Sequence, residues 1–494
     1  MKLYNFPEKY EKKSEDYEIL CEGKRVGAYA CRVSAHPFNR VWPGKQRDIS
    51  QTEGAAYVML GNDGETRLEI TPKTPFQRVA VRPAAKGAGI AVCGGTVSVT
   101  FPSAGQYTVE FDDCHHTLMV FIDPEKDLSA WRAGEDVLYF APGVHYADER
   151  ILLESGQTVF LDEGCVLYGS LNAVDQRDVR IVGHGVLDNS RMRRQDAIQS
   201  TPDIVSEEDP GIGLPIYCNR CENVTVEGIT IVDSSEWSMK FTGCKNVLVD
   251  NVKLCGMWRY NADGCDFCNT VNATVRNSFL RTFDDCLVVK GLASNRETPV
   301  EHILAENCVL WCDWGRCMEV GAETCAPYMR DITFRNCYVI RGSDVVMDVQ
   351  QGDSGDVEDV TFENIEIEYC GDEQRLAIQT EEDGEYPYRG VPHTPRPFVL
   401  VSGVTMWSHD DKAGDMRNIT FRNINIRTPD GQIPGGSFLK TREAKSRIEN
   451  VFFEGVRVNG RACSLRDLGV SVEGNVIGVH DGGERSAPEK GKKE

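Results

Sequence analysis

Three copies of one phrase lie between residues 221 and 280: CENVTVEGITI (Cys221–Ile231), CKNVLVDNVKL (Cys244–Leu254) and CNTVNATVRNSFL (Cys268–Leu280). Each copy holds two short apolar runs on either side of a polar bend. The copies begin 23 and then 24 residues apart, a period that suits one coil of a β-solenoid. A single coil cannot bury its own apolar face, but stacked coils can, at about 4.8 Å per layer through parallel strand pairing. The repeat therefore predicts a parallel β-helix.

The repeat extends well beyond these three copies. Val137–Leu171 already alternates β-rich runs with glycine and acidic turns, and variants of the phrase recur as far as Val458. We therefore expect the β-helix to span residues 131–482. An asparagine recurs at the bend, where its side-chain amide is expected to bond backbone groups of the next coil. The recurring asparagines are Asn223, Asn246, Asn307, Asn336, Asn364 and Asn423.

Residues 1–130 lack the phrase. They hold segments of alternating apolar and polar residues, such as GGTVSVTFPSAGQYTVEFDD (Gly94–Asp113), separated by Gly, Pro and Asp turns. This alternation predicts a small antiparallel β-sandwich domain before the β-helix, with the boundary near Asp123–Asp136. Residues 483–494 are small and charged, and we expect them to form a disordered tail. The predicted fold class is thus all-β.

The balance of charge is acidic. Lys and Arg number 54 against 76 Asp and Glu, which gives a formal net charge of −22 at pH 7. A field of this sign argues against nucleic acid as a partner and repels polyanionic substrates. Residues 1–17 lack the apolar core of a signal peptide, and no later stretch is long enough to span a bilayer. We therefore expect no membrane partner and a cytoplasmic location.

The chain holds 19 cysteines. In a cytoplasmic protein these are expected to be reduced thiols that pack as small hydrophobic side chains. The CxxC spacings Cys218/Cys221 and Cys265/Cys268 leave structural zinc as an alternative. A structural zinc site needs four ligands in defined spacing, whereas these pairs follow the repeat, so thiols in the core are the favoured interpretation.

Two acidic motifs stand apart from the repeat: NADGCD at Asn261–Asp266 and FDDCLVVKG at Phe283–Gly291. Asp263 and Asp284 are 21 residues apart, close to one coil, so Asp263, Asp284 and Asp285 are expected to converge from adjacent layers. Clustered acids repel one another and raise one pKa, which suits a pair in which one acid donates a proton and another activates water. A structural alternative exists, because Asp often bonds its own backbone in turns.

The string NADGCD…DDC…K resembles the NTDGxD…DDCxxxK signature of the polygalacturonase-like glycoside hydrolases, with Ala262 where Thr is usual. The resemblance covers roughly residues 137–365 and implies a right-handed parallel β-helix and an inverting hydrolase of an oligosaccharide or polysaccharide. It implies Asp284 as the general acid, with Asp263 and Asp285 holding the nucleophilic water. No metal and no organic cofactor is implied.

The chain departs from this family where a pectinase binds its substrate. Arg316 replaces the usual histidine, and Val346 and Asp348 align with the arginine and lysine of the galacturonate-binding motif. A carboxylate-binding site that loses two cations and gains an anion should not favour a uronic acid. The related dextranases and isopullulanases share the three aspartates, a preceding β-sandwich and an element resembling Glu319–Gly321. We therefore expect a neutral sugar chain as the substrate.

A set of residues around the aspartates is predicted to bind substrate, because they flank the acidic motifs or align with the family's sugar-binding positions. Aromatic rings stack on the apolar faces of sugars, and charged groups bond hydroxyls or orient carboxylates. The set is Asn261, Asp266, Trp258, Tyr260, Lys290, Arg316, Glu319 and Asp348. Gly371–Gly403 breaks the repeat, which indicates an insertion over the cleft or a homo-oligomer contact. Weaker subsite candidates are Tyr386, Tyr388, His393, Trp407 and His409.

Several functions are compatible with these residues. The leading hypothesis is inverting hydrolysis of a neutral oligo- or polysaccharide, and the second is polygalacturonase-type hydrolysis of pectic oligogalacturonides. A third is a non-catalytic β-helix that binds carbohydrate, although such a protein needs no triple-aspartate cluster. A β-helix polysaccharide lyase would use calcium and a base next to a substrate carboxylate, and the loss of substrate-binding cations argues against it.

Overall fold

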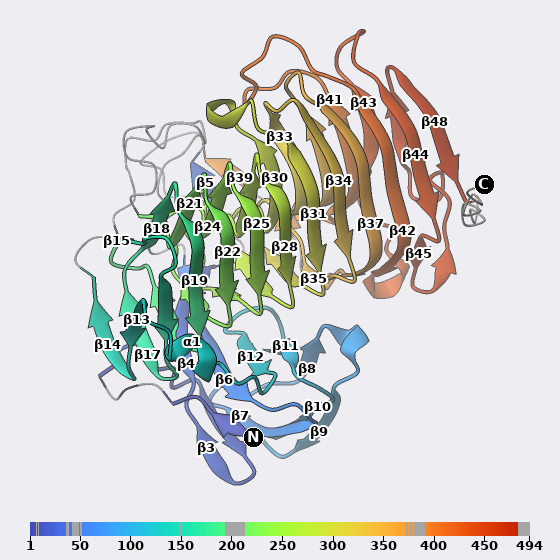
Figure 1. Cartoon of the computed structure of the whole chain (residues 1–494). Coiled ribbons are helices and arrows are strands. Elements are labelled where there is room, and N and C mark those ends of the chain that lie inside the picture. Colours follow the sequence, from blue (N-terminus) through green and yellow to red (C-terminus); the bar gives the residue numbers. More distant parts are fainter. Residues whose placement is uncertain are drawn as a thin grey trace, which may run out of the picture.

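The structure is a computed structural model of the chain that describes residues 1–5, 7, 9–35, 39–41, 49, 52–147, 150–192, 213–371, 374–375, 377–379 and 391–482. Figure 1 shows a long stack of coils that runs from β14 to β48, with the N-terminal strands, in blue, along one side of it. The predicted tail at 483–494 and the candidates Tyr386 and Tyr388 lie outside the described residues. No helix among the described residues is long and apolar enough to cross a membrane.

The N-terminal part forms two sheets that pack face to face, as the alternating segments predict. Along β7 (Thr66–Pro72), for example, residues alternate between buried and exposed. All pairs in these sheets are antiparallel except β12 with β6. The first sheet contains β1 (Lys2–Leu3), β4 (Tyr29–Ser34), β6 (Thr52–Gly61), β8 (Val79–Arg82), β11 (Gly105–Phe111) and β12 (Leu118–Asp123). The second contains β2 (Tyr17–Cys21), β3 (Lys24–Val26), β7, β9 (Gly89–Cys93) and β10 (Thr96–Phe101).

The described residues from β13 onward form the right-handed parallel β-helix that the repeat and the resemblance predict. Its coils contribute two strands to a 22-stranded sheet and one strand to an 11-stranded sheet. The larger sheet contains β13 (Val137–Phe140), β14 (Gly143–Tyr146), β16 (Thr158–Leu161), β17 (Cys165–Tyr168), β19 (Arg177–Gly183), β20 (Val186–Asp188), β22 (Glu222–Glu227), β23 (Thr230–Val232), β25 (Lys245–Asp250), β26 (Lys253–Cys255), β28 (Val271–Arg276), β29 (Phe279–Thr282), β31 (Val300–Glu306), β32 (Val309–Cys312), β34 (Tyr328–Arg335), β35 (Tyr338–Arg341), β37 (Asp356–Glu368), β42 (Met416–Arg427), β44 (Ile448–Glu454), β45 (Arg457–Val458), β46 (Arg461–Ala462) and β48 (Val476–Asp481).

The smaller sheet carries the residues of the candidate site. It contains β15 (Ile151–Leu152), β18 (Leu171–Val174), β21 (Ile216–Asn219), β24 (Met239–Thr242), β27 (Cys265–Cys268), β30 (Leu287–Gly291), β33 (Arg316–Thr324), β36 (Val345–Gln351), β41 (Arg396–Ser402), β43 (Phe438–Thr441) and β47 (Ser471–Glu473). The remaining elements are short: α1 (Ser129–Arg132), η2 (Ala84–Lys86), η4 (Ala293–Asn295), η5 (Pro429–Gly431), β5 (Asn39–Val41), β38 (Gln374–Arg375), β39 (Ala377–Gln379) and β40 (Val391–Pro392).

The core of the β-helix is built from rows in which the same position of each phrase lies above its counterpart. One fully inward row is Val224, Val247, Ala273, Ile303, Ile332, Val360, Ile419 and Val451. A second row stacks aromatic rings, with Phe334 and Phe362 centroids 5.0 Å apart and Phe421 and Phe453 centroids 4.8 Å apart. Each such buried side chain stabilises the fold by roughly 1.5–3 kcal/mol, so the repeat itself is the source of the core.

The bend asparagines adopt left-handed backbone geometry and bond from coil to coil. Asn223 and Asn246 have φ values of 59° and 57°. The amide of Asn246 donates to Asn223 Oδ1 at 2.9 Å, and Asn364 donates to Asn336 at the same distance. The structural role is confirmed, but the partners are side-chain amides of the neighbouring coil, not the backbone groups predicted from the sequence. Equivalent residues lie directly above one another, which brings the amides together.

The cysteines are all free thiols, and most are buried. Cys265 packs in the inner core, whereas Cys268 packs outside it in a cluster with Trp237. Because the two thiols face opposite sides of β27, this CxxC pair does not converge on one ion. Alternation along a strand, not metal ligation, explains its spacing.

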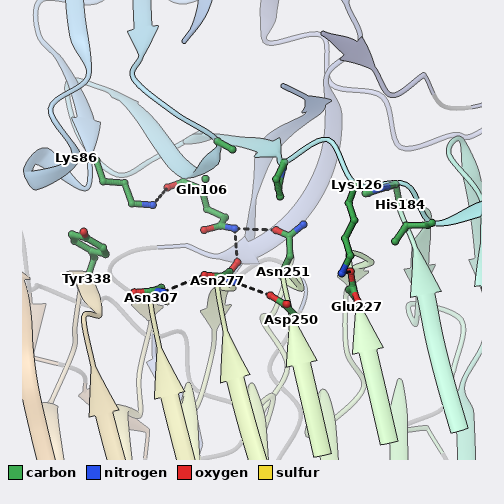
Figure 2. A pocket seen from close by; sticks show the side chains of 15 residues that line it. Lys86, Gln106, Lys126, His184, Glu227, Asp250, Asn251, Asn277, Asn307 and Tyr338 are labelled. Carbon is green, nitrogen blue, oxygen red and sulfur yellow. Dashed lines mark hydrogen bonds and ion pairs between the residues drawn. The ribbon is translucent and has the colours of Figure 1, made fainter. Parts of the chain in front are cut away.

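The N-terminal sheets contact the β-helix through a buried apolar cluster that includes Phe121 and Phe279, and through polar side chains that line an interdomain cavity of about 400 Å³. Figure 2 shows Gln106 reaching from β11 to the bends of the coils. Its amide donates to Asn251 Oδ1 at 3.1 Å and to the Asn277 carbonyl at 2.6 Å. Lys126 forms an ion pair with Glu227 at the other end of the cavity (Figure 2). The polar groups of this cavity therefore add hydrogen bonds and an ion pair to the apolar contact between the two parts of the chain.

A buried ion cluster adds to this interface at the end of β12. Lys253 Nζ and His184 Nδ1 each lie 3.0 Å from the Asp123 carboxylate. Burial alone would raise the pKa of Asp123, but these two partners lower it to about 2. The carboxylate is therefore ionised across the physiological range.

Candidate active site

The two acidic motifs occupy adjacent coils, as their spacing predicts. Asp263 precedes β27, and Asp284 and Asp285 precede β30, its neighbour in the sheet. Gly264 N donates to the Asp285 carbonyl at 2.8 Å, and Asp284 N donates to the Ala262 carbonyl at 3.3 Å. These backbone bonds hold one motif directly over the other, so that all three aspartates line one cavity.

The next coil fixes the Asp284–Asp285 pair through Gly315. A Cβ at this position would lie 2.5 Å from Asp284 Oδ1 and 2.4 Å from Asp285 Oδ1, closer than any real Cβ contact. The neighbouring Arg316 N donates to Asp285 Oδ1 at 2.7 Å. Both carboxylates therefore approach the backbone at Gly315 and Arg316, and only glycine fits between them.

A row of four charged residues, interrupted by Val288, follows the outer face of the smaller sheet. Strand pairing aligns Lys240, Asp266, Val288, Glu319 and Asp348, one from each successive coil. Residues aligned across parallel strands project from the same face of the sheet. The predicted residues Asp266, Glu319 and Asp348 are thus brought together by register.

Two cations lie among the carboxylates, the buried Lys290 and the partly buried Arg316. Lys290 Nζ is 3.8 Å from Asp263 Oδ2 and 4.6 Å from the centre of the Trp237 ring. The Arg316 guanidinium is 3.3 Å from Asp348, 3.7 Å from Asp285 and 3.9 Å from Glu319. Arg316, which stands in place of the family histidine, is therefore surrounded by three acids.

The acids of the site fall into two kinds by their pKa. Acids of the first kind retain their protons at neutral pH, and the second kind is ionised. Burial and the neighbouring charges of Asp266 and Asp284 raise the pKa of Asp263 well above its usual value. Burial raises the pKa of Asp266 to about 8, although Lys290 opposes the shift. At neutral pH this part of the cluster holds protons that it would lose in water.

Asp285 belongs to the second kind, the ionised acids. Burial opposes its ionisation, but Arg316 and a hydrogen bond with Glu319 lower its pKa. Glu319 shifts the other way, because burial and the charge of Asp285 raise its pKa. Burial raises the pKa of Asp348 to about 6, against the attraction of Arg316. The site thus presents an ionised Asp285 beside protonated acids, the combination that acid–base chemistry requires.

The cavity has a volume of about 260 Å³ and is lined by Trp237, Tyr260, Asn261, Asp263, Asp284, Asp285, Lys290, Trp314, Arg316, Glu319, Ala322, Glu323 and Trp407. Three predicted residues do not line it. Asp266 is aligned with Lys240 of the neighbouring strand, and Asp348 contacts Arg316. Trp258 packs beyond the cavity, where its Nε1 donates to Asp233 at 2.8 Å.

Sequence reasoning missed Glu323 and Trp314 as site residues. Glu323 is four residues after Glu319 on β33, and alternation along a strand gives both the same direction, so this signal was present in the sequence. Trp314 stacks on Phe283 from the turn before β33, which the repeat does not describe. Of the weaker candidates, Trp407 lines the cavity, whereas the backbone of His409 donates to Asp353.

One group among the described residues has the spacing of a metal site. Cys325, Asp353 and Asp410 each offer a ligand atom within 4.8 Å of the others. Their oxygens already accept hydrogen bonds: Asp353 from the backbone of Thr324, and Asp410 from the backbone of Ser354. These hydrogen bonds give the group a structural role as a junction between loops.

Comparison with known proteins agrees with this architecture. The model of glycosyl hydrolases family 28 matches residues 180–385, which include all three aspartates. A probable rhamnogalacturonase A of Aspergillus oryzae is 26% identical over 28% of this chain and 28% of its own length. A probable exopolygalacturonase B of Neosartorya fischeri is 24% identical over 52% of this chain and 60% of its own length.

The fold comparison extends over more of the chain. Dex49A from Penicillium minioluteum superposes with a TM-score of 0.64 at 13% identity, covering 94% of this chain and 91% of that one. By sequence, in contrast, the chain spans less than two thirds of the length of the two curated relatives. By its aspartate signature and the family match over residues 180–385, the chain is similar to the polygalacturonase-like glycoside hydrolases, and its fold is that of Dex49A.

Proposed function

We propose that this protein is an inverting glycoside hydrolase that cleaves an uncharged oligo- or polysaccharide. The observation that carries the proposal is the convergence of Asp263, Asp284 and Asp285 on one cavity from adjacent coils. In this mechanism Asp284 protonates the leaving glycosidic oxygen, while Asp263 and Asp285 hold the attacking water and the ionised Asp285 deprotonates it. The assignment of roles follows the family resemblance.

The protonation of the cluster supports this chemistry. General acid catalysis needs a carboxylic acid that keeps its proton near neutral pH, and general base catalysis needs an ionised partner. The raised pKa of Asp263 and the lowered pKa of Asp285 support a cluster that retains a proton beside an ionised carboxylate. Catalysis requires that Asp284 holds the proton of the cluster when the leaving glycosidic oxygen binds.

The uncharged substrate is supported by the state of the two cations. Arg316 already has three carboxylate neighbours, and Lys290 has two, at 3.8 Å each. Val346, at the position aligned with the family arginine, packs in the inner core. A uronate carboxylate would therefore meet five acids in the cavity lining and no cation without a partner among the described residues.

The aromatic lining suits a neutral sugar. Trp237, Trp314 and Trp407 border the cavity together with Tyr260. Aromatic faces stack on the C–H faces of sugar rings, a contact that needs no charge on the substrate.

Polygalacturonase-type hydrolysis is the second candidate. It is favoured by the names of the curated relatives and by the presence of Lys290 and Arg316 in the lining. A panel of neutral gluco-oligosaccharides and of oligogalacturonides, followed by NMR of the first-formed anomer, separates the two candidates and tests inversion. Preferred cleavage of oligogalacturonides would overturn the neutral substrate, and a retained anomer would overturn the inverting mechanism.

The third candidate is a β-helix that binds sugar without cleaving it. Substitution of Asp284 by Asn separates binding from turnover. Loss of cleavage with retained binding supports hydrolysis, whereas binding without cleavage in the wild-type protein across the whole panel would support the third candidate.

We further propose that the protein acts in the cytoplasm on short imported chains. The free state of all 19 cysteines supports a reducing environment. Cell fractionation of the source organism with an antibody against the protein tests this location, and recovery from the culture medium would contradict it.

A further inference from the structure

Glu323 is a buried carboxylate of the cavity that the proposed mechanism does not yet use. We propose that Glu323 is a positioning residue, which anchors the Lys290 ammonium beside Asp263, the carboxylate that orients the attacking water. The inference rests on the proposed function, because it gives Lys290 and Glu323 a task in that reaction.

The geometry places Lys290 between two acids. Lys290 Nζ lies 3.8 Å from Glu323 Oε2 and 3.8 Å from Asp263 Oδ2. Glu323 is on β33 and Lys290 is on β30, so the contact joins two neighbouring coils. The side chains of Lys290, Glu323 and Asp263 are 6%, 3% and 4% exposed. An ammonium in such a place needs opposite charge close by, because water does not solvate it.

The Trp237 ring restricts where the ammonium can go. Lys290 Nζ is 4.6 Å from the ring centre, and Lys240 Nζ is 4.5 Å from the same centre. The second ammonium repels the first, and it comes from β24, on the side of the sheet away from Glu323. Lys290 is thus directed toward β33 by attraction to Glu323 and by repulsion from Lys240.

Several other charged groups surround Lys290, and they come from each neighbouring coil. Asp266 lies on β27, Asp284 and Asp285 precede β30, and Glu319 lies on β33. Burial lowers the pKa of Lys290, but Glu323 raises it most, followed by Asp263 and Glu319, so that the pKa is well above its usual value. Loss of the Glu323 charge is therefore expected to lower the pKa of Lys290.

A protonated Lys290 supports catalysis through Asp263. Its charge opposes the burial and the neighbouring acids that raise the pKa of Asp263. When Lys290 loses its proton at high pH, this opposition ends and the water-orienting carboxylate loses its partner. Activity should then fall on the alkaline side, and it should fall at lower pH when residue 323 is uncharged.

The first test compares kcat/KM against pH for the wild type, Glu323→Gln and Glu323→Asp, with whichever oligosaccharide of the panel the wild type cleaves. Glu323→Gln is expected to move the alkaline limb to lower pH, and Glu323→Asp to restore it at least in part. Glu306→Gln is the matched control, because Glu306 pairs with Arg335 at 2.7 Å on the outer face of the β-helix, away from the cavity. An unchanged limb in Glu323→Gln, or the same change in Glu306→Gln, would overturn the inference.

The second test needs no substrate. Crystal structures of the wild type and Glu323→Ala at one pH show whether Lys290 keeps its place. We expect the ammonium to leave its position beside Asp263 and Trp237 in the variant, and an unmoved ammonium would refute the anchoring role. If the wild type cleaves nothing, the proposed function fails, while this test still decides whether Glu323 anchors Lys290.

Discussion

The interdomain cavity and the active-site cavity differ in how their polar groups are satisfied. The interdomain cavity is the larger, at about 400 Å³ against 260 Å³, and its groups bond to one another across the domain boundary. In the active-site region of the described chain, Asp263 Oδ1, Glu319 Oε2 and both oxygens of Asp266 are buried without a hydrogen-bond partner. Uncompensated carboxylates, and not cavity size, therefore mark the site where chemistry is expected.

The comparison also separates stability from activity. Buried acids with raised pKa values destabilise the fold, because the unfolded chain ionises more easily. Paired groups such as Gln106 and Asn251 stabilise it. Substitutions in the interdomain cavity should change the free energy of unfolding and leave turnover intact. Substitutions in the active-site cavity should change turnover and leave the free energy of unfolding intact.

The largest effect is expected from Asp284→Asn. Asparagine fills the same space but donates no acidic proton, so turnover should fall by about 10²–10⁴-fold. The loss of one like charge from the cluster should leave the unfolding midpoint unchanged or higher. Initial rates of reducing-end formation and urea unfolding measure the two quantities. A variant that keeps wild-type turnover would remove Asp284 from the role of acid.

The next effect is expected from Gly315→Ala. The added methyl group would lie 2.4 Å from Asp285 Oδ1 and 2.5 Å from Asp284 Oδ1, so both carboxylates must move. A displacement of about 1 Å at a reacting group costs on the order of 100-fold in rate. Gly436→Ala is the matched control, since a Cβ there meets nothing within 4 Å. Equal rates for the two variants would show that the aspartates tolerate the displacement.

The sequence predicted those features that the period of the repeat determines. The pairing of Val224 with Val247 and the stacking of Asp263 over Asp285 follow from one coil of 21 to 24 residues. Later steps of the row are longer, and there the recurring phrase itself predicts which residues align. It also predicted the predominance of antiparallel strands in residues 1–130, from alternation alone. The regular strands were thus accessible without a structure.

The turns between the strands could not be predicted from the repeat. Trp258 precedes NADG in the chain and was expected at the sugar, yet its turn directs the indole to Asp233. Trp314 enters the cavity from another turn, and Trp407 from a loop far along the chain. The path of a turn depends on tertiary contacts that no repeat encodes, so side chains on turns were placed least well.

A pH-dependent effect is expected from Asp266→Asn. The pKa of Asp266 is about 8 in the folded chain and close to its ordinary value of 3.8 when unfolded. The folded state therefore holds a proton that the unfolded state releases, so the contribution of Asp266 to stability falls as pH rises from about 4 to about 8. Asp266→Asn should unfold at a higher urea concentration than the wild type at pH 8 and at a similar concentration at pH 4. An equal difference at both pH values would assign the effect to packing instead of charge.

The smallest effect is expected in the interdomain cavity, from Gln106→Leu. The substitution leaves Asn251 Oδ1 and the Asn277 carbonyl without their donor, and a buried polar group left unpaired costs about 1–3 kcal/mol. The urea midpoint should fall while kcat/KM stays at the wild-type value, because Gln106 does not line the active-site cavity. Thr71→Val is a matched control, since it removes a hydrogen bond with Thr96 that lies within the N-terminal sheets. A loss of activity in Gln106→Leu alone would show that docking of the N-terminal sheets shapes the active site, and the two cavities would then not be independent.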